Sequence, residues 1–383
     1  MKANPATGPA ATPATTAEDR EALRGTLRAF FTEHGAEDAV RRLMTVESGH
    51  DPVVWTLITR QLGLTALGLP EEYGGVGGPA ELAVACTEAG RALLGAPLLS
   101  TLLAGQAVLT AGDPAACADL LPRIADGTVT GTVAVAEPDG RWRPDAYATA
   151  ARLAGGAWEL HGTKTFVLDA LTADLIVAVA QTDEGPGLFA VENASVAMGL
   201  TRRGLATLDL TRRQGRLDFA GTPARRLDRG DGAAAVGRVL DIAAVLLAAE
   251  QVGGARYVLE QTAEYARTRV QFGRPIGSFQ AVKHKLADVL IRVESADSAA
   301  FGAVAAWEAD DAELPLVAAL AKAYCSEAYV HAAQEAVQVH GGIGFTWEHW
   351  AHLYLKRARS THELFEAPRV HRERMAGLLV NTP

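Results

Sequence analysis

Residues 265–280, YARTRVQFGRPIGSFQ, lie between two long segments whose apolar residues repeat at helical spacing. The glycines and the proline in this stretch predict that one helix ends here and that another begins after a turn. Long runs of helical pattern cover residues 233–268, 279–309, 314–339 and 350–379. A second interruption, GGIG at residues 341–344, separates the last two runs. Helices of this length with wide apolar faces predict a C-terminal four-helix bundle, a fold that often packs against another subunit.

Two other zones precede the bundle. From Glu18 to about Ile124, apolar side chains recur three and four residues apart, which predicts helices. From Gly131 to about Leu227, short β-rich runs alternate with turn clusters, which predicts a small β-sandwich or barrel rather than βαβ units. The expected strands are 132–136, 158–161, 165–168, 175–180 and 188–191.

We therefore expect an α+β chain in the order all-α, all-β, all-α, without an internal repeat. Its 383 residues, 49% of them hydrophobic, suffice for a large core divided among more than one domain. The expected domains are an N-terminal α-helical domain at 18–130, a middle β domain at 131–228 and a C-terminal bundle at 229–383.

Composition excludes several classes of protein. The chain has 36 Lys and Arg against 45 Asp and Glu, a net charge of −9, which argues against a nucleic-acid partner. Cys86, Cys117 and Cys325 have no metal-like spacing and leave one cysteine over. A disulfide framework is therefore not expected, and a reducing cytoplasm is the expected compartment.

Two segments bear on targeting and membranes. Residues 1–17 are rich in Ala, Pro and Thr without an apolar core, so we expect a disordered tail and no secretory or transit signal. The uncharged stretch 92–112 is long enough to span a membrane. Because it contains Pro97 and scattered hydroxyl side chains, we expect two buried helix segments instead, and no membrane partner.

Two familiar motifs are interpreted as chance matches. The letters GPGLFA at 185–190 fit a dinucleotide-binding turn, but we expect strands on both sides, which is the wrong context. His349 and His352 are three residues apart, as ligands on one helical face could be, yet no convincing third ligand accompanies them. We therefore expect no metal site.

The two interruptions of the bundle are more informative. Residues 265–280 combine arginines, an aromatic side chain and glycines, a set that suits a nucleotide or pyrophosphate. The alternative is a plain helix connection with solvated arginines. Residues 338–346, QVHGGIGFT, expose backbone that could bind a phosphate or the edge of a flavin. A C-terminal glycine cap of the preceding helix is the alternative there.

Together, these segments resemble the acyl-CoA dehydrogenase family of flavoproteins. The motifs that carry the resemblance occur in the family's order: GLPEEYGG at 68–75, AEP at 136–138, GTKTFV at 162–167, RVQFGRPI at 269–276 with Phe279 and Gln280, and QVHGGIGF at 338–345. The resemblance covers nearly the whole chain, and the α–β–α order agrees with the family's architecture.

The resemblance implies FAD as cofactor, shared between subunits of a dimer or a dimer of dimers. By position, Arg269, Gln271 and Phe272 would hold the pyrophosphate and adenine end of an FAD bound mainly by a neighbouring subunit, with Gln280 nearby. The segment from Gln338 through Gly341 to Gly342 would also line that FAD.

The resemblance also implies which residues lie at the flavin ring. Ala136 and the segment Phe166-Val167-Leu168 would lie against the isoalloxazine, with Phe166 at a position where the family often has Trp.

The reaction that the resemblance implies is an α,β-dehydrogenation of an acyl thioester: a carboxylate removes the α-proton and flavin N5 takes the β-hydride. One family position for the base is near Ala243, where this chain has no carboxylate. The other follows an aromatic residue, and Leu364-Phe365-Glu366-Ala367, nine residues after Arg357, resembles it. Glu366 is the expected base and Glu363 the fallback, although Glu366 could be an ordinary solvated carboxylate. Asp241 and Ala367 are the positions expected at the substrate.

Departures from the family pattern leave alternatives open. DGRWRP at 139–144 replaces the usual run of small residues, Leu168 stands where Thr is common, and Ala244 where Arg is expected. These changes are typical of an actinobacterial-type branch, so the thioester could be on coenzyme A or on an acyl carrier protein. The expected electron acceptor is an electron-transfer flavoprotein or a similar protein.

The assembly and the reaction type also stay open. A homodimer, a homotetramer and a heterotetramer are all compatible with the pattern. The chain could be the non-catalytic or half-site partner of a heteromeric dehydrogenase, or a flavin oxidase or monooxygenase on the same scaffold.

Overall fold

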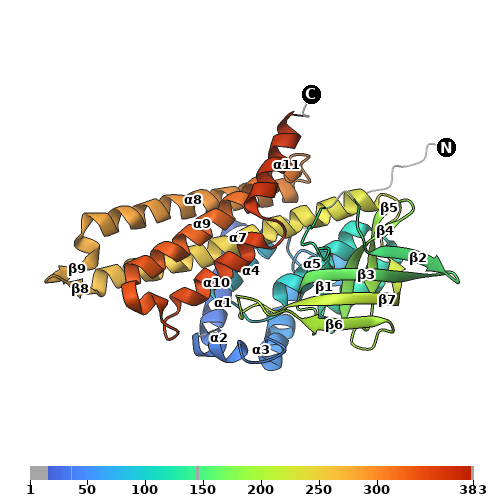
Figure 1. The fold of residues 1–383 in the computed structure, drawn as a ribbon, viewed down its shortest axis with the longest axis horizontal. Coiled ribbons are helices and arrows are strands. Elements are labelled where there is room, and N and C mark those ends of the chain that lie inside the picture. The colour runs from blue at the N-terminus through green and yellow to red at the C-terminus, as the bar shows by residue number, and fades with distance from the viewer. Residues whose placement is uncertain (1–15, 36, 144–145, 381–383) are drawn as a thin grey trace.

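The computed structural model describes residues 16–35, 37–143 and 146–380 (Figure 1). Most of the tail expected to be disordered therefore lies outside the described residues. Three zones follow one another as expected from the sequence: helices, then a β domain, then long helices, so the predicted α+β class and domain order are confirmed. The expected boundaries at 130/131 and 228/229 fall between elements, and we keep them as a proposal.

The N-terminal zone is helical. Its first helix starts at a capping box, in which the Thr16 hydroxyl accepts from the Asp19 N–H at 3.1 Å and the Asp19 carboxylate accepts from the Thr16 N–H at 3.0 Å. The helices are α1 (Ala17–His34), α2 (Glu37–Leu43), α3 (Pro52–Thr56), α4 (Pro79–Arg91), α5 (Leu98–Ala111) and α6 (Pro114–Ala125). The stretch 92–112 contains one buried helix, α5, and not the two expected, because residues 92–97 form the connection from α4.

The middle zone is a seven-stranded sheet: β1 (Gly131–Ala134), β2 (Ala150–Ala154), β3 (Ala157–Leu168), β4 (Leu175–Thr182), β5 (Gly185–Val191), β6 (Leu200–Gly204) and β7 (Gln214–Arg226). Its pairings run β4–β5–β7–β3–β2 and return to β4, so the sheet closes on itself as a small barrel. β1 adds to β4 in parallel and β6 adds to β7. The GPGLFA letters lie in β5, directly after β4, so strands flank them as predicted.

Two details of the sheet differ from expectation. The runs 158–161 and 165–168 belong to one strand, β3, whose pairing with β7 shifts register between Lys164 and Val167. β2, β6 and β7 form where no strand was predicted, because their residues alternate with arginines and glycines and so lack a β-rich pattern.

The C-terminal zone is the predicted bundle. Its elements are α7 (Gly232–Thr268), β8 (Val270–Gln271), β9 (Arg274–Pro275), α8 (Gln280–Glu308), α9 (Leu314–His340), α10 (Ala351–Glu363) and α11 (Pro368–Val380). The first interruption is a hairpin in which Phe272 and Gly273 both have positive φ, as a tight two-residue turn requires. The run expected at 350–379 is divided at residues 364–367, where Phe365 and Glu366 have φ of 55° and 76°.

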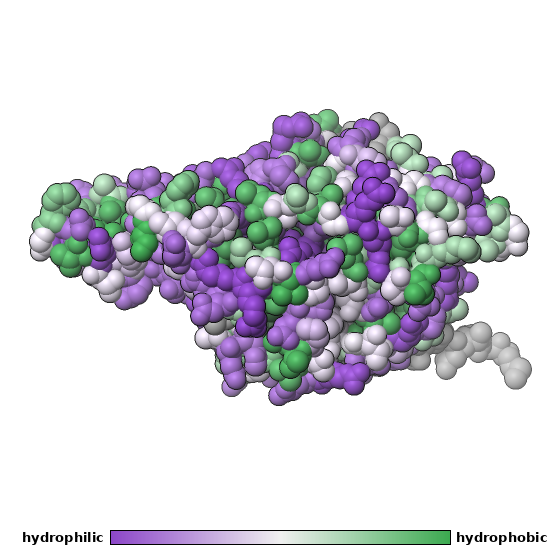
Figure 2. Space-filling model, turned by 60° about the horizontal axis from the view of Figure 1, so that its bottom comes forward, coloured by the Kyte–Doolittle hydropathy of each residue, from purple (hydrophilic) through white to green (hydrophobic). Residues whose placement is uncertain are grey.

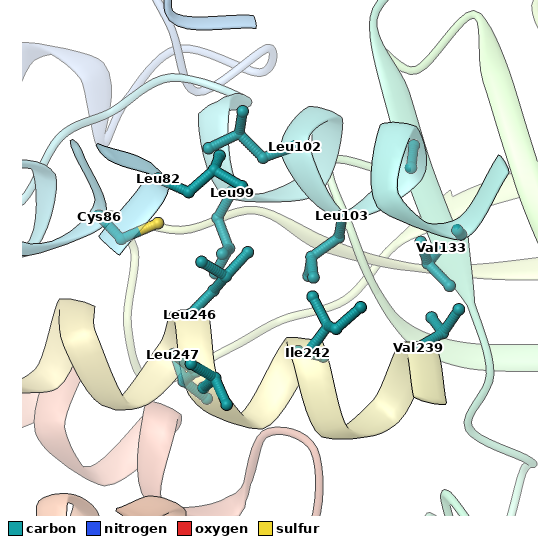
Figure 3. Packing of buried hydrophobic residues seen from close by; sticks show 14 of the residues in the cluster. Leu82, Cys86, Leu99, Leu102, Leu103, Val133, Val239, Ile242, Leu246 and Leu247 are labelled. Atoms are coloured by element: carbon teal, nitrogen blue, oxygen red, sulfur yellow. The ribbon is translucent and has the colours of Figure 1, made fainter. Parts of the chain in front are cut away.

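The core lies where α4, α5 and β1 pack on α7 (Figure 3). Leu99 and Leu103 from α5 lie over Ile242 and Leu246 of α7, with Val133 of β1 beside them. Helix α7 is long and apolar enough to cross a membrane by length and composition, but 72% of its most apolar window is buried inside the protein. Burial in this core accounts for its composition.

Candidate active site

Glu366 lies in the turn between α10 and α11 and is 8% exposed. Its Oε1 accepts the main-chain N–H of Arg143 at 3.1 Å. Burial raises the pKa of the Glu366 carboxyl above its usual range, although the positive charge of Arg143 opposes that rise. A buried carboxylate with a raised pKa is typical of a general base, so Glu366 is not an ordinary solvated carboxylate.

The turn that carries Glu366 is strained. Positive φ at a residue other than glycine costs about 1–3 kcal/mol and persists only where neighbouring contacts hold it. One such contact comes from α11, where His371 Nε2 donates to the Phe365 carbonyl at 2.8 Å. Pro368 limits the turn on its other side, because the residue before a proline avoids helical geometry.

Glu366 and Ala367 line a cavity of about 580 Å³ between the β domain and the last helices. Phe166 from β3, Trp142 from the β1–β2 connection and Leu208 from the β6–β7 connection form the wall on the side of the β domain. The structure therefore brings together three of the expected site residues: Glu366, Ala367 and Phe166. Glu363, the fallback base, also lines the cavity, but its side chain is exposed and contacts His362.

Phe166 faces the cavity because of the irregularity in β3. It has φ of 52°, and its side chain is 40% exposed. Val167 and Leu168 are buried in the hydrophobic cores, and Ala136, also buried, uses its carbonyl to accept the Thr165 N–H at 3.0 Å. Phe166 is thus the member of this expected set whose side chain lines the cavity.

The segment 139–143, which departs from the family pattern, fills space beside Glu366. Trp142 is 4% exposed and packs edge to face on Phe365, with ring centroids 4.9 Å apart. The Arg143 guanidinium reaches Asp241 at 2.7 Å, and Arg374 from α11 binds the same carboxylate at 2.5 and 3.0 Å. Asp241, expected at the substrate, is therefore buried between two arginines and lies outside the lining of this cavity.

Arg357 supports the wall of the cavity to which Leu208 belongs. It is fully buried on α10 and binds Asp209 at 2.7 Å and the Thr211 carbonyl at 3.0 Å, both in the β6–β7 connection. Glu250 of α7 accepts from it at 3.2 Å. Because this connection also contains Leu208, Arg357 fixes the β domain against the bundle at the edge of the cavity.

The two glycine-broken corners lie at the other end of the bundle (Figure 1). Stacking of Tyr265 on His340, with centroids 4.2 Å apart, brings the ends of α7 and α9 together. The expected FAD residues there are exposed and lie outside the lining of the Glu366 cavity: Arg269, Gln271, Phe272, Gln280, Gln338, Gly341 and Gly342. Phe272 is 91% exposed, and Figure 2 shows apolar side chains among polar ones at this narrow end.

A second cavity, of about 390 Å³, links the two regions. It is lined by Gly344 and Phe345 of the second corner and shares Leu208 and Arg359 with the Glu366 cavity. Arg359 has no ion-pair partner among the residues that the structure describes. Two neighbouring cavities, with a cationic side chain shared between their linings, therefore lie between Glu366 and the second corner.

The histidines considered as metal ligands are engaged with the main chain. His349 Nδ1 accepts the Ala351 N–H at 3.2 Å, and His352 Nε2 contacts the Trp347 carbonyl at 3.2 Å. In the described ranges, no cluster of three or more His, Cys, Asp or Glu side chains is arranged to hold a metal ion.

Comparison with known proteins identifies the family of this chain. The family model for the acyl-CoA dehydrogenase C-terminal domain matches residues 230–376, and the model for the N-terminal domain matches residues 17–128. This chain belongs to the acyl-CoA dehydrogenase family. It is an oxidoreductase of that family, as the sequence predicted.

Individual members of the family match over nearly the full chain. Acyl-CoA dehydrogenase IpdE2 of Mycobacterium tuberculosis is 39% identical over 359 residues, which are 92% of this chain and 94% of that protein. Among solved structures, a variant of the Tcur3481–Tcur3483 steroid ACAD has a TM-score of 0.88 at 33% identity, covering 96% of this chain and 99% of that one. The ChsE4–ChsE5 complex from Mycobacterium tuberculosis has a TM-score of 0.87 at 29% identity, covering 96% and 99%.

Acyl-CoA dehydrogenases are FAD enzymes, so the predicted cofactor is confirmed at the level of the family. The residues of this chain fit FAD. Phe166 offers an aromatic face beside Glu366, and Arg359 and Arg269, which have no ion-pair partners within the described residues, offer guanidiniums that suit a pyrophosphate.

Sequence reasoning missed several side chains at this site. Trp142 and Arg143 were noticed only as a departure, and their contacts with Phe365 and Glu366 depend on the tertiary fold. His371 and Lys322, which bind the carbonyls of the Glu366 turn, were not expected. The sequence alone could have drawn attention to Lys322, because it is a charged residue within an apolar helical run.

Proposed function

We propose that this acyl-CoA dehydrogenase removes the α-proton of an acyl thioester with the carboxylate of Glu366. The observation that carries the proposal is the position of Glu366: its carboxylate is buried, has a raised pKa, and lines the same cavity as Phe166. A raised pKa makes a carboxylate a stronger base.

The chain's own residues would perform three tasks. The Arg143 N–H holds Glu366 Oε1, so that the carboxylate is oriented before substrate arrives. Trp142, Phe365 and Leu364 exclude water around it, which preserves its basicity. FAD, when bound, supplies the acceptor for the β-hydrogen and its electron pair.

Assembly is part of the proposal. We infer that Arg269, Gln271, Phe272 and Gln280 hold the FAD of a neighbouring subunit, together with Gln338, Gly341 and Gly342. Their exposure and their separation from the Glu366 cavity support this inference. Electrons would then leave to an electron-transfer flavoprotein or a similar acceptor.

The substrate that we propose is a coenzyme A thioester with a bulky acyl group. One matched structure is named as a steroid ACAD, and a cavity of about 580 Å³ is of the size that holds a drug-sized ligand. A panel of acyl thioesters on coenzyme A and on a carrier protein, scored by anaerobic bleaching of the flavin, tests this choice.

A second candidate is the partner subunit of a heteromeric dehydrogenase. Two matched structures are named as pairs of different proteins, and the segment 139–143 fills space that small residues leave open in the family pattern. Purification of this chain alone separates the two candidates. A yellow homo-oligomer that bleaches with an acyl thioester rejects the second. A chain that becomes yellow only with a partner, in a complex whose bleaching Glu366→Gln does not change, rejects the first.

The base is tested by Glu366→Gln, with Glu363→Gln as the matched control. General-base catalysis contributes about 10²- to 10⁴-fold. We expect Glu366→Gln to keep its FAD, and its flavin to be bleached by substrate at least about 10²-fold more slowly than that of the parent. Glu363→Gln should bleach at the parent's rate. Undiminished bleaching in Glu366→Gln would reject the assignment, and loss in Glu363→Gln alone would transfer it to Glu363.

A further inference from the structure

Lys322 is a fully buried lysine in the first half of α9, and its side chain contacts the turn that carries Glu366. Lysine side chains are almost never fully buried unless their charge has partners. The neighbours of Lys322 on α9 are mainly alanines, so apart from Ser326 on the same helix its partners come from other parts of the bundle.

The partners match the ammonium group. Nζ donates to the Ser326 hydroxyl at 3.0 Å, to the His362 carbonyl at 3.2 Å and to the Glu366 carbonyl at 3.1 Å. An ammonium has three N–H donors, and these acceptors use all of them. The His362 carbonyl belongs to the last turn of α10, where carbonyls lack helical partners and a positive charge is favoured.

Helix α7 supports the same arrangement. Gln251 is fully buried, donates to the Ser326 hydroxyl at 3.0 Å and to the Thr361 carbonyl at 3.1 Å, and thereby fixes the acceptor that Lys322 uses. With His371 on the Phe365 carbonyl, four carbonyls at and before the turn, those of Thr361, His362, Phe365 and Glu366, are bound by side chains from α7, α9 and α11. The left-handed backbone of Glu366 is therefore held from three sides.

We propose that Lys322 is a positioning residue for the catalytic base: its ammonium holds the main chain at Glu366 so that the carboxylate points into the substrate cavity. This inference rests on the proposed role of Glu366. Lys322 itself has no place in the lining of the cavity, so it acts through the turn and not on the substrate.

The geometry makes the positioning dependent on pH. The charged and titratable groups that face Lys322 are Glu363 on α10, Glu366 in the turn, His371 on α11 and Cys325 on α9. Burial lowers the pKa of Lys322 to about 7, and the two glutamates only partly offset that effect. Above this pH the neutral amine has two N–H donors for three acceptors, so its hold on the turn weakens.

A loss of activity caused by deprotonation of Lys322 can be distinguished from a loss caused by unfolding, because the two affect stability in opposite directions. The pKa of Lys322 is lower in the folded chain than in the unfolded chain, so between about pH 7 and the unfolded value the unfolded chain binds more protons. Stability from this group therefore rises with pH in that window, while activity falls. Unfolding would make both fall together.

The test is Lys322→Met, with Lys285→Met as control. Lys285 is a paired lysine on α8, bound to Glu335 at 2.6 Å and distant in sequence from the turn. For each purified FAD-loaded variant, flavin content, substrate affinity and the anaerobic bleaching rate are measured from pH 5.5 to 9.

We expect Lys322→Met to keep FAD and substrate affinity, to bleach about 10- to 100-fold more slowly at pH 6, and to lose the fall in rate that begins near pH 7. The control should keep the parent's rate and pH profile. Parental bleaching in Lys322→Met, or an unchanged alkaline fall, would overturn the inference.

A second variant keeps the test decisive if Lys322→Met does not fold. Ser326→Ala removes one of the three acceptors, which disfavours the charged amine, so the alkaline fall should move to lower pH. An unmoved midpoint would overturn the inference. The proposed function fails separately, because normal bleaching in Glu366→Gln contradicts it whatever the lysine variants do.

Discussion

The main-chain N–H of Arg143 binds the carboxylate of Glu366 at 3.1 Å and so joins the β domain to the strained turn of the bundle. The two residues lie 223 positions apart in the sequence. The guanidinium of the same arginine is held by Asp241 on α7, so Glu366, the proposed base, is oriented by a loop that is itself anchored in the core.

Trp142 limits the space beside Glu366. Trp142→Ala removes a buried indole that packs on Phe365 and should destabilise the chain by about 3–5 kcal/mol. The enlarged cavity should shift the preference towards bulkier acyl groups. Chemical denaturation and a bleaching panel measure both effects. Trp55→Ala, at a buried position on α3, should lose comparable stability without a change in preference; an equal shift in both variants contradicts this role.

Asp241 is a structural carboxylate in this account. Asp241→Asn leaves Arg143 and Arg374 without their shared anion, and breaking such a buried pair costs about 3–5 kcal/mol, here towards the lower value because both arginines are partly exposed. Asp310→Asn, at an exposed pair with Arg238, should cost about 0–1 kcal/mol. Urea unfolding compares the two variants. Parental stability of Asp241→Asn with weakened substrate binding would instead support direct substrate contact.

His371 should make the chain sensitive to acid. Burial lowers its pKa to about 3 in the folded chain, whereas the unfolded value is about 6.5. A lowered folded pKa means that its contribution to stability is complete above about pH 6.5 and is lost as the pH falls towards 3. His371→Gln should flatten this part of the dependence of Tm on pH. His284→Gln, at an exposed site on α8, should leave the parent's slope; an unchanged slope in His371→Gln contradicts the account.

Arg269 should bind a pyrophosphate from across the subunit interface. Arg269→Gln removes a charge-assisted contact of about 1.5–3 kcal/mol, which is roughly a 10- to 150-fold loss of FAD affinity. Arg267→Gln, two residues earlier and paired with Glu264, is the matched control and should keep its FAD. Flavin content after dialysis measures both. Equal retention in the two variants would remove Arg269 from the site.

Much of the fold was predictable because long amphipathic runs specify helices locally. The predicted ends of α7 and α9 differ from the structure by one residue, at Ala233 and Val339. The division at residues 364–367 was missed because positive φ at Phe365 and Glu366 depends on contacts from distant helices. The parallel pairing of β1 with β4 is also non-local, and no turn between them signals it.

The candidate site was predictable where chemistry and family pattern coincide, as at Glu366 and Phe166. It was not predictable where the chain departs from that pattern. Nothing local to residues 139–143 indicates that Trp142 would be buried or that Arg143 would bind two different carboxylates.

Exchange of the α-proton tests the central claim most directly. Phenylacetyl-coenzyme A has acidic α-hydrogens but no hydrogen to donate at the next carbon, so it isolates proton removal from flavin reduction. In heavy water, the FAD-loaded parent and Glu363→Gln should exchange the α-hydrogens, followed by NMR, and Glu366→Gln should do so at least about 10²-fold more slowly. Exchange by Glu366→Gln at the parent's rate would contradict the account.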